Sequence, residues 1–299
     1  MNAIEQLRKK VIQQMMSLDT IKNVWPTWKV EIQGIVKNTP PDHKDLMKIG
    51  DSLYQIFKKT SQAGRSQSSV SGGGTAWEVL VCWYLNLCLI GSRTVVVRAR
   101  KEHVPEPISD SITVLYGKIK SNTESDLLAI TFPDTCFNNK NNFLTTASLK
   151  NYLEMEITNQ FKKTELTVIQ CKTNWNDNAQ IPMLWDLIYR STGFGNAATV
   201  GINNFINSGL GKFTYAFATV PTVDHKKIKS NSTCVLRVNN LSGGNYWGLP
   251  SNNTIALNIF ELISKNFQTS LSAYKSSWNS DIAAEVNDMY TNQGNYFLL

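Results

Sequence analysis

Cysteine is scarce in this sequence of 299 residues, and the five cysteines form no CxxC pair. Their number is odd, and Cys82, Cys88 and Cys171 lie among apolar residues. A disulfide framework or a structural zinc site requires paired cysteines at regular spacings. The pattern therefore argues against both and predicts reduced cysteines in the core of a cytoplasmic protein.

Long hydrophobic runs are also missing. The most apolar stretch, residues 76–90, contains Glu78 and Asn86 and is shorter than the roughly 20 residues that cross a bilayer. The first residues, MNAIEQLRKKVIQQMM, predict a charged amphipathic helix rather than a signal peptide. We therefore expect a protein without a membrane partner.

Histidine and the common ligand-binding motifs are scarce as well. His43, His103 and His225 are far apart and lack the spacing of a metal-binding pair. SGGGT lacks the lysine of a phosphate-binding P-loop, and GFGNAATVG has the wrong glycine spacing for a dinucleotide fingerprint. No G-x-S-x-G elbow occurs. P-loop hydrolases, dinucleotide-dependent enzymes and serine hydrolases are therefore not indicated.

The charge that is present is mainly basic. Lysine and arginine number 30 and aspartate and glutamate 23, which gives a formal net charge of +7. Such an excess favours polyanionic partners, with nucleic acid first and an anionic membrane second. A mildly basic enzyme without such a partner is the alternative that charge alone leaves open.

Hydrophobic periodicity predicts an α/β protein. Apolar residues recur at helical spacing through residues 1–64, an N-terminal helical region that is either separate from residues 65–299 or part of the same domain. A polar loop is expected at residues 61–74, and a central mixed β-sheet flanked by helices after it. Further helices are expected at residues 75–90, 148–163, 179–190 and 259–275, and strands at 93–99, 125–132, 165–173, 199–205, 213–220 and 233–238.

The strand ELTVIQCKT, residues 165–173, ends in an unusual way. Side chains alternate between the faces of a strand, so Gln170 and Lys172 share one face with Val168. Two polar side chains on one face of a buried strand suggest a site. The alternative is a strand that emerges into solvent, where Gln and Lys are ordinary.

Two carboxylates stand in comparable positions. Asp126 opens the apolar strand of residues 125–132, where its oxygens could bind a divalent cation or where it could simply form a turn. Glu78 is the only charged residue of the apolar helix of residues 76–90. A buried carboxylate needs a cationic partner or a metal, although a place in the first helical turn would offset part of the cost.

Together these residues resemble the PD-(D/E)xK nuclease superfamily, and within it the type II restriction endonucleases. That family has a glutamate on a helix, an aspartate at a strand start and (D/E)xK, or less often QxK, on the neighbouring strand. Here the order is Glu78, Asp126 and Gln170-Cys171-Lys172, over a catalytic core of about residues 70–190. The resemblance implies a restriction-endonuclease-like fold and a Mg²⁺ cofactor.

The resemblance also implies a role for each residue. Mg²⁺ held by Asp126, the amide oxygen of Gln170 and Glu78 would neutralise the scissile phosphate and lower the pKa of a bound water. Lys172 would orient or deprotonate that water and stabilise the developing charge.

The sequence departs from the family pattern in two places. Gln170 replaces the usual acid, so one metal-binding charge is lost, and Glu78 is the residue that could supply it. The gap between Asp126 and Gln170 is also long enough to hold an inserted helix. A literal Pro-Asp occurs at Pro133-Asp134, at the far end of the strand. Asp126 is preferred because the family's aspartate opens its strand, and Asp134 is the rival.

Basic, amide and acidic side chains around this core are candidate DNA contacts. Lysine and arginine neutralise phosphates, asparagine and glutamine pair with adenine edges, and aspartate accepts from cytosine. The candidates are Arg93, Arg98, Arg100, Lys118, Lys120, Asn174, Asn176, Asp177, Gln180 and Arg190. For any single one, a solvated charged surface is the alternative. The segment of residues 190–212, rich in glycine and asparagine, suits a loop that enters a groove.

We therefore expect a Mg²⁺-dependent type II restriction endonuclease, part of a restriction-modification system, that hydrolyses double-stranded DNA at a short specific sequence. A homodimer is expected because a palindromic site matches a two-fold protein axis. Two alternatives remain. One is another nuclease of the same superfamily that acts in repair or junction processing. The other is a non-catalytic DNA-binding protein in which Gln170 marks a lost activity.

Overall fold

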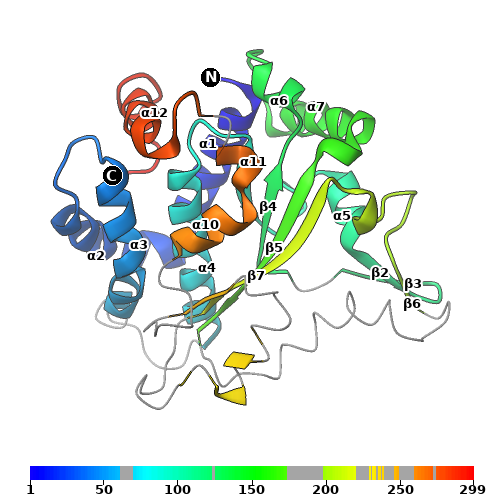
Figure 1. The fold of residues 1–299 in the computed structure, drawn as a ribbon, viewed down its shortest axis with the longest axis horizontal. Coiled ribbons are helices and arrows are strands. Elements are labelled where there is room, and N and C mark those ends of the chain that lie inside the picture. Colours follow the sequence, from blue (N-terminus) through cyan, green and yellow to red (C-terminus); the bar gives the residue numbers. More distant parts are fainter. Residues whose placement is uncertain are drawn as a thin grey trace.

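A β-sheet lies between two groups of helices (Figure 1). The computed structural model describes residues 1–60, 70–122, 125–173, 198–219, 229, 231–233, 235, 236, 238, 246–248, 259–271 and 274–299. The strands are β1 (Thr94–Arg98), β2 (Thr113–Tyr116), β3 (Ile119–Asn122), β4 (Leu127–Thr131), β5 (Glu165–Lys172), β6 (Ala198–Val200), β7 (Lys212–Thr219) and β8 (Tyr246–Gly248). The helices are α1 (Ala3–Met16), α2 (Asp19–Ile35), α3 (His43–Lys58), α4 (Val70–Cys88), α5 (Glu106–Ile112), α6 (Asp134–Asn138), α7 (Thr146–Asn159), α10 (Phe260–Asn266), α11 (Gln268–Leu271) and α12 (Trp278–Asn292).

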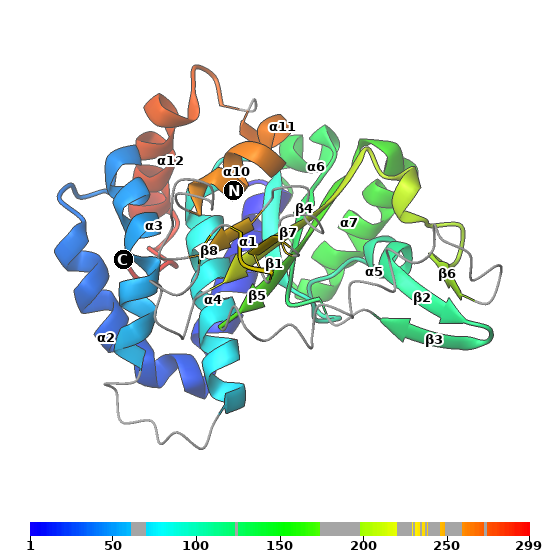
Figure 2. The same cartoon turned by 60° about the horizontal axis from the view of Figure 1, so that its bottom comes forward.

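The larger sheet is mixed, which confirms the predicted mixed sheet flanked by helices. Among the described residues it has five strands, in the order β1-β4-β5-β7-β8. The pairs β1–β4 and β4–β5 are antiparallel, whereas β5–β7 and β7–β8 are parallel. Strand β4 is buried along its whole length, as its unbroken apolar run predicts for a central strand. A smaller antiparallel sheet, β3-β2-β6, extends from α5 (Figure 2).

The pairing of β4 with β5 determines which side chains share a face. Leu127 pairs with Ile169, and Leu128 pairs with Val168. Paired residues of a ladder point to the same side of the sheet, and neighbours along a strand alternate. Leu128, Val168 and Gln170 therefore lie on one face, while Leu127 and Ile169 lie on the other.

Helix α4 covers the second of these faces. It contacts β1 and β5, and the indole N–H of Trp77 donates to the carbonyl of Ala218 in β7 at 2.9 Å. The Asn86 side chain bonds both main-chain groups of Val96 in edge strand β1, at 2.7 and 3.1 Å. Helices α10 and α11 lie on the same side as α4, and α5 and α7 lie on the opposite side (Figures 1 and 2). None of the described helices is long and apolar enough to cross a membrane.

The N-terminal helices share their hydrophobic core with the sheet. Leu7 of α1, Trp28 of α2 and Leu53 of α3 belong to the same buried cluster as β4 and β5. Side-chain hydrogen bonds reinforce the junction, as in the bond from the Tyr84 hydroxyl of α4 to the Leu46 carbonyl of α3 at 3.1 Å. Residues 1–60 therefore pack as part of one body with the sheet.

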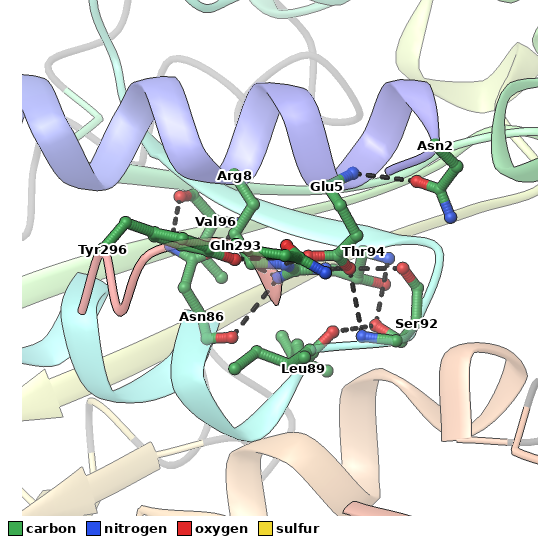
Figure 3. Close-up of polar contacts among 12 residues, drawn as sticks. Asn2, Glu5, Arg8, Asn86, Leu89, Ser92, Thr94, Val96, Gln293 and Tyr296 are labelled. Atoms are coloured by element: carbon green, nitrogen blue, oxygen red, sulfur yellow. Dashed lines mark hydrogen bonds and ion pairs between the residues drawn. The ribbon is translucent and has the colours of Figure 1, made fainter. Parts of the chain in front are cut away.

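A buried polar cluster joins the N-terminus to the core (Figure 3). Arg8 is fully buried, and its guanidinium contacts both Glu5 oxygens at 3.0 and 3.2 Å. It also donates to the Asn86 side-chain oxygen at 3.1 Å and to the Ser92 carbonyl at 3.3 Å. The Tyr296 hydroxyl approaches Glu5 at 3.4 Å from the C-terminal segment. One arginine thus links α1 to α4, to the start of β1 and, through Glu5, to the chain's last residues.

The strand predicted at residues 233–238 is wrong, because the described residues 233, 235, 236 and 238 are helical. Val235 and Val238 are buried, whereas Leu236 is 46% exposed. A spacing of three places Val235 and Val238 on one helix face, but a strand would have buried Leu236 together with Val238.

Other helices and strands begin or end at residues that differ from the predicted ones. Helix α4 begins at Val70, so the last part of the polar loop predicted at residues 61–74 is helical. The strand predicted at residues 199–205 is only the short β6. The predicted helix of residues 179–190 lies outside the described residues. Helices α5, α6 and α12, the β2–β3 hairpin and the short strand β8 were not predicted.

Removing the buried guanidinium should destabilise the fold. We expect Arg8→Ala to lower the free energy of unfolding by about 3–5 kcal/mol, because Glu5 would remain buried without its cation. Lys22→Ala, which breaks a solvent-exposed ion pair with Asp19, is the control and should have little effect. Urea denaturation followed by tryptophan fluorescence measures both. Equal, small effects would show that the Arg8 cluster does not stabilise the fold.

Candidate functional site

The structure brings Asp126 and Lys172 together. Because β4 and β5 are antiparallel, the start of β4 lies beside the end of β5. Asp126 immediately precedes β4, and Lys172 is the last residue of β5. The Lys172 Nζ lies 3.5 Å from the Asp126 Oδ2, and the same oxygen accepts a hydrogen bond from the Cys171 N–H at 2.7 Å. A main-chain donor and an ammonium therefore hold one carboxylate oxygen at the strand ends.

Gln170 is close to this pair and is buried. The register places it opposite Asp126, and it is only 3% exposed. The Lys172 side chain is 12% exposed and that of Asp126 is 19% exposed. The alternative in which this strand end emerges into solvent is therefore wrong. The polar side chains of Asp126, Gln170 and Lys172 therefore lie together where the start of β4 meets the end of β5, in an otherwise hydrophobic sheet.

Glu78 approaches from α4. Its Oε2 lies 3.0 Å from the Arg98 Nη2, and both side chains are largely buried, at 18% and 12% exposure. Helix α4 begins at Val70, so Glu78 lies well past the first turn and the helix N-terminus cannot stabilise it. Arg98, the last residue of β1, compensates its charge instead. Arg98 pairs with Leu127, the residue after Asp126, which brings Glu78 to the same end of the sheet.

The electrostatics of the site follow from burial. Burial, the largest effect, raises the pKa of Asp126 above its ordinary value; Lys172 and the Cys171 N–H lower it, and the charge of Glu78 raises it again. Lys172 therefore offsets only part of the cost of keeping Asp126 ionised. A further cation between these carboxylates would stabilise the anionic forms of both.

The available donors suit a hard divalent cation. Asp126, Glu78 and the amide of Gln170 offer oxygens, the ligand type of Mg²⁺, which retains several waters in protein sites. Among the described residues no three His, Cys, Asp or Glu side chains form a cluster able to hold a metal. The donor set fits Mg²⁺ only if Gln170 and water complete it.

Asp134, the rival aspartate, lies at the other end of β4. It is the first residue of α6, which follows the end of β4, whereas Asp126 precedes the start of β4. Its carboxylate pairs with Arg93 at 2.8 Å. The structure therefore brings neither Asp134 nor Arg93, a candidate DNA contact, to the side chains of Gln170 and Lys172.

The other candidate DNA contacts have different surroundings. Arg98 is engaged with Glu78, and its Nε has no hydrogen-bond partner among the described residues. Arg100 is exposed and lines a cavity beside the sheet. Lys118 and Lys120 are exposed on the β2–β3 hairpin, which projects from the body (Figure 2). Asn174, Asn176, Asp177, Gln180 and Arg190 lie outside the described residues.

Sequence reasoning missed two partners in this site. It treated Arg98 as a phosphate contact, whereas the structure pairs it with Glu78. It also gave no role to the main-chain N–H of Cys171, which bonds Asp126. No signal in the sequence identifies either one, because both depend on how α4, β1, β4 and β5 come together.

No protein-family model matches this chain, and no curated protein matches it at a significant level. The interpretation of the site therefore depends on its own geometry and chemistry.

Removing the ammonium should change the titration of the neighbouring carboxyl. We expect Lys172→Met to raise the pKa of Asp126 further, because burial and Glu78 would then act with less opposition. ¹³C NMR of labelled aspartate carboxyl carbons, with EDTA present, measures this pKa. The variant should also lose more stability at neutral than at acidic pH, since only ionised Asp126 needs the lysine.

Asp281 provides an internal control for this titration. Its pKa is lowered by a hydrogen bond from the Ser276 N–H at the start of α12, and it should not respond to the substitution. An unchanged or lowered pKa of Asp126 in Lys172→Met would contradict the proposed coupling.

Proposed function

We propose that this protein is a Mg²⁺-dependent DNA endonuclease of the PD-(D/E)xK type, specifically a type II restriction endonuclease. The observation that carries the proposal is the contact between Lys172 and Asp126 at the paired ends of β5 and β4, beside buried Gln170. Glu78 adds a second carboxylate from α4. An ammonium next to oxygen donors suits the hydrolysis of a phosphodiester, which is anionic and repels an attacking hydroxide.

Each residue of the candidate site has a defined task in this mechanism. Mg²⁺ at the oxygens of Asp126, Gln170 and Glu78 would supply neutralisation of the scissile phosphate and acidification of water. Lys172 donates hydrogen bonds that orient the attacking water and stabilise the charge that develops on the phosphate. Asp126 holds the Lys172 amine in place, and the Cys171 N–H holds Asp126. Arg98 forms an ion pair with Glu78 and holds its carboxylate near the site.

The proposed substrate is double-stranded DNA. The chain carries a net charge of +7. Exposed Arg100 follows β1, and exposed Lys118 and Lys120 lie on the β2–β3 hairpin. Cations placed along a duplex neutralise its phosphates and position it without reading its sequence. A homodimer would present two such sites to a palindromic sequence. Cytoplasmic location, where a restriction-modification system meets foreign DNA, belongs to the same proposal.

The wild-type protein should cut DNA into discrete bands. We expect phage DNA incubated with the protein and Mg²⁺ to give a fixed set of fragments on a gel, and no fragments when EDTA is added. A smear, or cutting of branched DNA only, would instead indicate a repair or junction-processing nuclease. Binding without cutting would indicate a non-catalytic DNA-binding protein in which Gln170 has replaced a required acid.

Single substitutions test the assigned residues. Lys172→Ala and Asp126→Ala should each reduce the cleavage rate by roughly 10²-fold or more, because each removes charge stabilisation from the reacting phosphate. DNA affinity measured by fluorescence anisotropy should be largely retained. Asp134→Ala is the matched control, since it removes an aspartate from the other end of β4, and it should cut normally. The opposite pattern would move the metal ligand to Asp134.

A further inference from the structure

A cavity of about 430 Å³ lies on the opposite side of the sheet from α4. It is bounded by residues 99–104, by α5, by α7 and by the start of β4. Its volume falls in the range of roughly 300–1,000 Å³ that is usual for small-ligand pockets. Val104, Ile112 and Leu128 form an apolar wall and are 6%, 5% and 1% exposed. The cavity is therefore lined by core side chains as well as by surface ones.

The cavity adjoins the candidate site. Ser125 and Leu128, which line it, are the neighbours of Asp126 and Leu127 in the chain. Leu128 lies on the same face of the sheet as Gln170, because it pairs with Val168. A ligand in the cavity would therefore lie next to the phosphate on which Asp126 and Lys172 are proposed to act.

Helix α7 holds the cavity walls in place. The Lys150 Nζ donates to the Lys101 carbonyl at 2.8 Å, and the Glu154 Oε1 accepts from the Glu106 N–H at 2.8 Å. Lys150 and Glu154 also pair with each other at 3.6 Å. These contacts tie α7 to the segment after β1 and to the start of α5. The cavity is thus formed in the protein alone and does not need a ligand to create it.

The lining combines three kinds of chemistry. Arg100 and Lys101, both exposed, supply cations at the end of β1. Glu106 and Asp110 supply carboxylates from α5, and Asp110 accepts from the Asn203 amide at 2.9 Å through one oxygen. The apolar wall lies beside them. A ligand that matches all three has an anionic group, a flat apolar body and amino hydrogens.

A nucleotide with an amino-bearing base has these properties. Lysine and arginine bind phosphate oxygens, and carboxylates accept hydrogen bonds from exocyclic amino groups such as the N4 amine of cytosine. Thymine lacks such an amine. The flat face of a base can pack on Val104, Ile112 and Leu128.

We propose that this cavity is a binding site for one nucleotide whose base carries an exocyclic amino group. Its phosphate lies toward Arg100 and Lys101, and its base lies against the apolar wall with the amine toward Glu106. The choice of ligand rests on the proposed function, since a DNA nuclease meets nucleotides as substrate and as product. The nucleotide is either part of a DNA strand, turned out of the duplex beside the cleaved phosphate, or free in solution.

Mononucleotides test the cavity without any cleavage. The full-length protein is titrated with dAMP, dCMP, dGMP, dTMP and inorganic phosphate, and the methyl NMR signals of Val104, Ile112 and Leu128 are followed. We expect at least one amino-bearing nucleotide to shift these signals and to bind at least fivefold more tightly than dTMP. Inorganic phosphate should leave the methyl signals in place. Absence of methyl shifts with every nucleotide would overturn the proposal.

Matched variants separate the three parts of the cavity. Arg100→Ala should weaken nucleotide binding at least fivefold, whereas Lys22→Ala, which removes a cation from remote α2, should not change it. Glu106→Gln should abolish the preference over dTMP while retaining most of the phosphate-dependent affinity. Unchanged binding and preference in both cavity variants would also overturn the proposal.

A second measurement identifies the source of the nucleotide. Duplexes cut by the wild-type protein are labelled with 2-aminopurine next to the cleavage position and bound to the Lys172→Ala variant. A rise in fluorescence that Glu106→Gln reduces would show a nucleotide of the DNA strand in the cavity. No rise, together with mononucleotide binding, would assign the site to free nucleotides. If the wild-type protein cuts no DNA, the proposed function fails, and the mononucleotide titration still decides whether the cavity binds nucleotides.

Discussion

The antiparallel pairing of β4 with β5 is the constraint on which the rest of the site depends. With Leu127 opposite Ile169, Asp126 meets the end of β5, where Lys172 and the Cys171 N–H contact its carboxylate. A shift of one residue would turn every side chain of one strand to the other face and separate the two charges. The hydrophobic burial of both strands prevents such a shift, because it would move Val168 and Leu128 out of their core positions.

Helix α4 carries two polar side chains into the interior, those of Glu78 and Asn86, and each has a polar partner there. The helix is apolar on nearly all sides, yet Glu78 and Asn86 are conspicuous exceptions. Arg98 neutralises Glu78, and Asn86 bonds the main chain of Val96 and the guanidinium of Arg8. Glu78 and Asn86 thus both reach β1, which aligns the helix with the sheet and places a carboxylate near Asp126. The cluster around Arg8 extends this network to the two chain ends.

The sheet divides the molecule into a structural side and a side suited to binding. On the α4 side, core side chains and the helices α4, α10 and α11 cover the sheet. On the α5–α7 side, Lys150 and Glu154 tie the segment after β1 and the start of α5 to α7, and these elements line a cavity beside the candidate site. Gln170 and Lys172 therefore share a face with the proposed nucleotide site, whereas Glu78 and Arg98 reach the same end of the sheet from the α4 face. This arrangement would let the protein act on a phosphate while contacting its neighbouring base.

The sequence by itself determined the class of the fold and the identity of the polar residues in the core strands. The apolar run after Asp126, the alternation of Val168, Gln170 and Lys172 and the apolar helix around Glu78 all follow from side-chain periodicity. Only the tertiary structure decided that Asp126 rather than Asp134 lies beside Lys172 and that Arg98 pairs with Glu78. It also decided that residues 233, 235, 236 and 238 are helical where the sequence suggested a strand. The reason is physical: periodicity reports which side chains avoid water, but partner choice depends on strand register and on helix packing between residues far apart in the chain.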